Sequence, residues 1–122
     1  MSAAASITSG SLIAADKVEG TNVYNLAGDA LGTIDDIMID KASGRAVYAV
    51  MSFGGFLGIG EKYHPLPWSI LKYNTSKDGY VVNLDKKALE GAPTFERDSN
   101  PNWTSDYGRT IDSFYKVPGY QA

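Results

Sequence analysis

The sequence has 122 residues, of which 43% are hydrophobic and 20% are charged, and its net charge is -3. This length and composition predict one globular domain that needs no disulfides or structural metal. There is no cysteine, so disulfide bridges, thiolate zinc sites and thiol catalysis are excluded. The net charge offers no general attraction for nucleic acid or an anionic membrane. No apolar run approaches the ~20 residues that span a bilayer.

The chain divides by composition into an arm, a domain and a tail. Residues 1–10 are mostly small and predict a flexible N-terminal arm. The arm has no basic start and no long apolar core, so as given it is not expected to be a signal peptide. The domain is expected over residues 11–93 and the tail over residues 94–122. The lack of cysteine suits a reducing compartment, and we expect a cytoplasmic protein.

Six short strands are predicted in the domain. A turn or a single helical turn that ends at Gly20 precedes the first strand, at residues 21–25. Further strands are expected at residues 31–40, 45–53, 62–66, 69–74 and 80–84. Short strands joined by tight turns predict a mainly β protein, either a small barrel or a sandwich.

The second predicted strand does not alternate regularly between apolar and polar residues. Ile34 and Met38 lie in one phase, whereas Ile37 and Ile39 lie in the other. Either both faces of the strand are partly buried, or a β-bulge near Asp35–Asp36 shifts the register.

Two local signals mark turns and a helix. In the hairpin loop 41–44, Gly44 is placed to take the left-handed conformation. Asp85 is a good N-cap for a short helix over residues 86–90, and Gly91 is a good residue to end it.

The stretch from Tyr48 to Trp68 organises the rest of the chain. It begins as an apolar strand, and four glycines between residues 54 and 60 then interrupt it. Pro65 makes the ladder pairing of the following strand doubtful, since proline has no backbone donor. Trp68 is expected to anchor the core at the end of that strand.

Two groups of apolar residues are predicted to form an interaction surface. One lies between the glycines, where little local side-chain mass can bury it, although it could also plug the barrel. The other falls at helical spacing in the aromatic tail and is expected to pack on the barrel or on a neighbouring subunit. Together the predicted surface comprises Phe56, Leu57, Ile59, Tyr107, Ile111, Phe114 and Tyr115.

The sequence resembles the PRC-barrel family over roughly residues 12–95. The similarity is carried by residues 18–25 (VEGTNVYN), 28–32 (GDALG), 37–40 (IMID), Gly44 with residues 45–50 (RAVYAV), 52–60 (SFGGFLGIG) and the pair Pro67–Trp68.

The resemblance implies a six-stranded antiparallel β-barrel that serves as a docking module and has no family catalytic residue. The family's domain occurs in the photosynthetic reaction-centre H subunit, in a bacterial ribosome-maturation factor and in small stand-alone bacterial proteins. This chain is similar to the stand-alone kind, since it lacks the membrane helix of the first and the N-terminal domain of the second.

Three groups of residues suggest chemistry, but each has a simpler explanation. The glycines match neither the Walker spacing nor a dinucleotide fingerprint, so they predict a structural turn. His64 is the only histidine, which favours a packed side chain over a metal or proton-transfer role. Asp35, Asp36 and Asp40 could suggest a hard cation, but solvated carboxylates are favoured because no calcium-loop pattern surrounds them.

From these observations we expect a non-enzymatic interaction or assembly module with no cofactor and no metal. The predicted partner is a second copy of the chain, as a homodimer or a higher homo-oligomer, and no direct contact with nucleic acid is expected. One alternative is an assembly factor for ribosomes or RNA that acts through a protein partner. The other is a small-ligand-binding protein.

Overall fold

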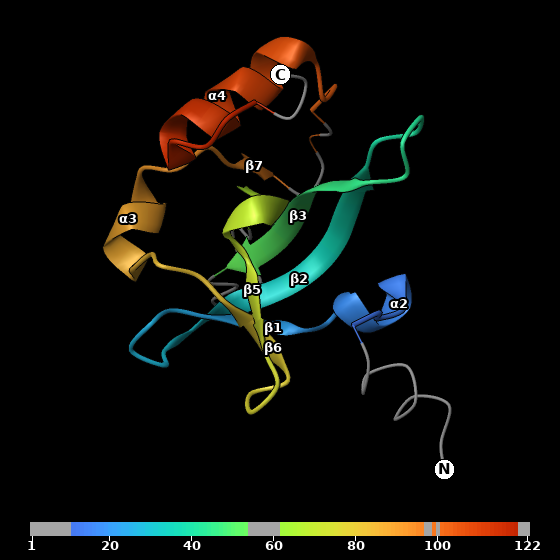
Figure 1. Ribbon diagram of the computed structural model, residues 1–122. Coiled ribbons are helices and arrows are strands. Elements are labelled where there is room, and N and C mark those ends of the chain that lie inside the picture. The colour runs from blue at the N-terminus through green and yellow to red at the C-terminus, as the bar shows by residue number, and fades with distance from the viewer. Residues whose placement is uncertain (1–10, 54–61, 97–98, 100, 120–122) are drawn as a thin grey trace.

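The protein is mainly β, and within its described residues seven strands form a single sheet (Figure 1). The computed structural model describes residues 11–53, 62–96, 99 and 101–119. The strands are β1 (Asn22–Tyr24), β2 (Ala30–Ile39), β3 (Ala46–Phe53), β4 (Lys62–Pro67), β5 (Lys72–Asn74), β6 (Gly79–Val81) and β7 (Phe95–Glu96). The helical segments are α2 (Ala15–Val18), the 3-10 turn η2 (Trp68–Ile70), α3 (Lys86–Glu90) and α4 (Ser105–Tyr115). None of these helices is long and apolar enough to cross a membrane.

The sheet differs from the expected barrel of six antiparallel strands. Its strand order is β5-β6-β1-β2-β3-β4-β7, and β6 runs parallel to β1. Within the described residues no ladder joins β5 to β7, so the sheet is not closed there. The differences arise because η2 occupies the start of the expected fifth strand, and because β7 adds a two-residue strand beyond α3. The β5–β6 hairpin then docks on β1 through β6.

A β-bulge explains the irregular pattern of β2. The register between β2 and β3 shifts between Ile34, which lies opposite Met51, and Asp36, which lies opposite Val50. Ile37 then lies opposite Ala49. Since side chains in a regular strand alternate between faces, Ile34 and Ile37 could not share a face without this extra residue. The bulge predicted near Asp35–Asp36 is confirmed.

The main core is formed by one face of the sheet and by residues from α2 and α3. Its buried members are Val18, Val23, Leu31, Ile34, Ala49, Met51, Leu66, Leu71, Tyr80, Val82 and Leu89. Trp68, the predicted anchor, is half-buried at the start of η2 and packs against this core. Its ring meets the ring of Tyr80 edge-on at a centroid distance of 5.5 Å.

β4 pairs along its whole length with β3 despite its two prolines. Pro65 lies opposite Val50 and Pro67 lies opposite Tyr48, so the doubt about ladder pairing at this strand was wrong. The prolines are two residues apart, and their missing donors therefore lie on the same side of the strand. On the side away from β3, the ladder with β7 ends at Tyr63, before the first proline.

The predicted turn and cap residues occupy their expected positions. Gly44 has a φ of 79° in the hairpin between β2 and β3, and Gly20 has a φ of 87° after α2. The Asp85 carboxylate accepts a hydrogen bond of 2.7 Å from the Ala88 backbone N–H, which caps α3. The helix ends at Gly91, whose φ is -97° rather than left-handed.

A Gly32→Ala substitution is expected to lower the free energy of unfolding by about 1–3 kcal/mol, because the added methyl group overpacks the sheet. A Cβ at this position would collide with the carbonyl oxygen of Ser52 and would lie 3.0 Å from Met51 Cγ. Gly91→Ala is the matched control, since its Cβ would meet no atom within 4 Å. Urea unfolding of both variants tests this, and equal midpoints would show that β2 and β3 can separate at no cost.

Candidate functional site

The structure places the predicted surface residues in different environments. Phe56, Leu57 and Ile59 lie outside the described residues. In α4, Ile111 is fully buried, Tyr115 packs against the main core, and Tyr107 is half-buried. Only Phe114 is exposed, with 38% of its surface accessible. Of the predicted residues on α4, Phe114 is therefore the one most available to a partner.

Both ends of α4 are fixed by local interactions. At the N-terminus, the Thr104 hydroxyl accepts a hydrogen bond of 3.2 Å from the Tyr107 backbone N–H. At the C-terminus, Lys116 has a φ of 58°, and the backbone N–H of Val117 donates to the Asp112 carbonyl oxygen. These caps set the end of the helix just beyond Phe114.

A buried hydrogen bond connects α4 to β3 of the sheet. The Tyr48 hydroxyl donates to Asp112 Oδ1 at 3.0 Å, and both side chains are buried. Burial raises the pKa of Asp112, and the hydrogen bond from Tyr48 partly offsets this increase. α4 also contacts β4. Phe114 is thus presented on a helix held by both polar and apolar contacts.

A mainly apolar hollow of about 600 Å³ lies on one side of Phe114. We call it the Phe114 groove and define it by its apolar lining residues Leu26, Ile70, Val81, Leu84, Ala88 and Phe114. Leu26 is 70% exposed at its rim. The charged residues that line the groove, within the described part of the chain, are Lys72 and Lys116.

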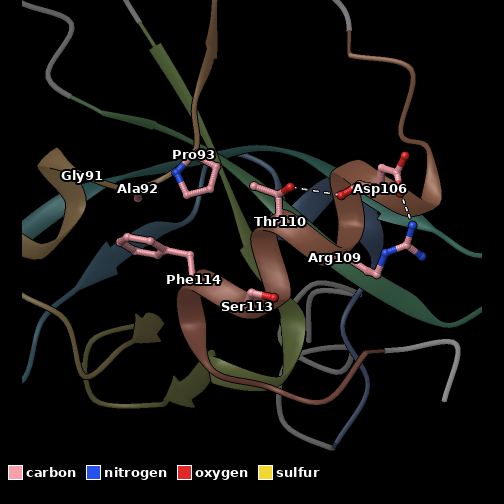
Figure 2. Close-up of a pocket in the computed structure, with 8 residues that line it drawn as sticks. All are labelled: Gly91, Ala92, Pro93, Asp106, Arg109, Thr110, Ser113 and Phe114. Carbon is pink, nitrogen blue, oxygen red and sulfur yellow. Dashed lines mark hydrogen bonds and ion pairs between the residues drawn. The ribbon is translucent and has the colours of Figure 1, made fainter.

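A second, more open hollow lies on the other side of Phe114, between α4 and the segment Gly91–Pro93 (Figure 2). The Phe114 ring is directed toward Ala92 and Pro93, whereas Asp106 and Arg109 lie at the opposite end of the hollow. These two side chains form an ion pair along the helix. Phe114 therefore forms the boundary between the two hollows.

Two of the remaining candidate groups are His64, which is buried, and Asp40, which is hydrogen-bonded within a hairpin. His64 is 4% exposed, and burial, with a smaller effect of the Lys62 charge, lowers its pKa to about 4. The carboxylate of Asp40 accepts a hydrogen bond of 2.8 Å from Ser43 N–H in the hairpin. This hydrogen bonding lowers the pKa of Asp40. Among the described residues, no group of three potential metal ligands is clustered.

The family model of the PRC-barrel domain matches residues 11–89 of the chain. The chain belongs to the PRC-barrel domain family. A comparison with curated proteins finds no match. The matched range covers the strands from β1 to β6, whereas β7 and α4 follow it in the sequence. In this PRC-barrel protein Phe114 thus comes from outside the matched range, and most of the groove lining comes from inside it.

Sequence reasoning missed the environments of two residues, Leu26 and Trp103. Leu26 follows β1 in a polar turn and was not recognised as exposed apolar surface. Trp103, just before α4, contacts the rings of Tyr48, Phe95 and Tyr107 at centroid distances of 5.4 to 5.9 Å. Its φ of 53° is unusual for a bulky residue and has no sequence signal.

Proposed function

We propose that this PRC-barrel protein is a non-enzymatic interaction and assembly module that docks a protein through the Phe114 groove. The observation that supports this most is the exposure of Phe114 and Leu26 beside an apolar hollow. An exposed aromatic next to an apolar depression is typical of an interface, where aromatic anchors dominate the binding energy.

The partner that we propose is a second copy of the chain. Each copy offers both a projecting aromatic side chain and an apolar hollow, which is what a two-fold interface between identical surfaces requires. The whole chain carries a net charge of -3, whereas the groove is lined by Lys72 and Lys116. In a two-fold interface these lysines lie near those of the second copy, so apolar contacts, and not charge attraction, hold the proposed dimer together. We place the assembly in the cytoplasm.

The absence of catalysis is part of the proposal. His64, the single histidine, is buried and keeps a lowered pKa, so it is poorly placed to exchange protons with a substrate near neutral pH. A turnover that disappeared in a His64→Ala protein would contradict this part of the proposal.

Phe114→Asp is expected to weaken self-association by more than about 30-fold, as the loss of an interface hot spot does. Sedimentation velocity over a concentration series measures the dimer constant directly. Ser113→Asp is the matched control, because it adds the same charge at an adjacent exposed residue that does not line the groove. Leu57→Asp tests whether the glycine-rich stretch takes part in self-association, a role that stays a sequence prediction.

Two outcomes would contradict the proposed dimer. A wild-type protein that sediments as a monomer at high micromolar concentration would exclude self-association. Equal weakening by Phe114→Asp and Ser113→Asp would show that added charge, and not the loss of the ring, is responsible. Circular dichroism of each variant distinguishes dissociation from unfolding.

A further inference from the structure

A third pocket, separate from both hollows beside Phe114, lies over the face of the sheet opposite the main core. It has a volume of about 440 Å³ and is lined by residues of β2, β3, β4, β7 and the segment before α4. Besides Met38 and Val50, its lining combines two carboxylates with three aromatic rings. They are Asp35, Asp36, Tyr63, Phe95 and Trp103.

The sheet register brings the aromatic rings together. Tyr63 of β4 lies directly opposite Phe95 of β7, and their ring centroids are 5.4 Å apart at an interplanar angle of 55°. Phe95 meets Trp103 at 5.9 Å and 83°. The successive rings that line the pocket are therefore inclined to one another rather than stacked. The face of an aromatic ring carries the negative part of its quadrupole and attracts cations.

The bulge in β2 places the two carboxylates at the same pocket. Asp36 lies opposite Val50, which also lines the pocket, and Asp35 is the extra residue of the bulge. Asp36 accepts a hydrogen bond from Ile37 N–H, and Asp35 accepts one of 3.4 Å from the Ser52 hydroxyl. Within the described part of the chain no lysine or arginine lines this pocket. Among the described lining residues, the charged groups are therefore the two carboxylates.

We propose that this pocket binds a weakly hydrated organic cation, of the quaternary ammonium or guanidinium type. Aromatic faces attract such cations, and the carboxylates supply the countercharge at the pocket wall. Calcium and magnesium are poorer occupants, since they need six or more oxygen ligands or retained waters. The volume lies within the range of small-molecule sites.

The test is a titration followed by two-dimensional NMR, with the Trp103 indole N–H as the reporter. Choline represents a free quaternary ammonium compound, and a capped Ala-Arg-Ala peptide represents an arginine side chain of a protein partner. The control ligand is 3,3-dimethylbutanol, the neutral isostere of choline. Binding of choline or the peptide at the pocket, with no binding of the neutral isostere, would support the proposal and would identify the source of the cation.

Two variants establish which groups bind the cation. Trp103→Leu should weaken binding by about 5- to 30-fold, the range expected for loss of a cation–π contact. The double variant Asp35→Asn/Asp36→Asn should weaken it as well, and it remains informative if Trp103→Leu does not fold. The control Asp16→Asn/Glu19→Gln removes the same charge at exposed positions in and next to α2, and should bind as wild type does. Equal binding of choline and its isostere, or no binding of either cation at high millimolar concentration, would overturn the proposal.

Discussion

Replacing Ile111 by alanine is expected to lower the free energy of unfolding by about 2–5 kcal/mol, the range for truncating a buried aliphatic side chain. Ile111 is fully buried on α4, a helix that contacts β4 and lies after the family-matched range. The loss would therefore show that the C-terminal segment is part of the folded unit. Urea unfolding, followed by far-UV circular dichroism, measures the change.

Ser113→Ala provides the control for Ile111→Ala. Ser113 is exposed on the same helix, two residues away, so its truncation should change the free energy of unfolding by less than about 0.5 kcal/mol. If both variants kept the wild-type urea midpoint, α4 would have to be detached from β4 in solution. The proposed presentation of Phe114 would then lose its structural basis as well.

Acidification is expected to destabilise the protein by up to about 3 kcal/mol through His64 alone. Burial lowers the pKa of His64 from 6.5 to about 4, so the folded protein keeps the imidazole neutral where the unfolded chain protonates it. The unfolded state then binds more protons between these two pKa values. Stability is therefore complete above about pH 6.5 and declines as the pH falls toward 4.

A His64→Leu variant isolates this effect, because leucine has a similar size and does not titrate. Urea unfolding at about pH 7 and about pH 4 should show a smaller loss of stability for the variant than for the wild type. Burial raises the pKa of Asp112, so its contribution has the opposite sign and stabilises the folded state as the pH falls. The contribution of Asp112 is the same in both proteins, so it cancels when their losses of stability are compared. Equal losses in the two proteins would mean that His64 titrates normally.

The order of the long strands could be predicted from the sequence, whereas the edges of the sheet could not. β2 and β3 have apolar runs and a hairpin glycine, Gly44, that fix their pairing. β7 has only two residues, too few for any periodic pattern, and its pairing with Lys62 and Tyr63 depends on the whole fold. The parallel pairing of β1 with β6 also depends on the tertiary fold, since neither three-residue strand has a sequence pattern that predicts its direction.

The residues of α4 and of the Phe114 groove could be predicted only in part, because their exposure and their proximity depend on the tertiary fold. Helical spacing in the tail identified the residues of α4, but it could not tell that Ile111 is buried and Phe114 exposed. That difference depends on which face of the helix meets β4. The Phe114 groove joins Leu26, Leu84 and Phe114, which are far apart in the sequence and give no local motif.

The prolines of β4 limit the ways in which another protein can associate with this sheet. Many partners add a strand to an exposed edge and pair with its backbone, and the same geometry drives edge-to-edge aggregation. Beyond β7, β4 continues with Pro65 and Pro67, which are buried and have no backbone N–H to donate to an incoming strand. At the opposite edge, β5 has only three residues, from Lys72 to Asn74. Association at these edges by backbone pairing is therefore disfavoured.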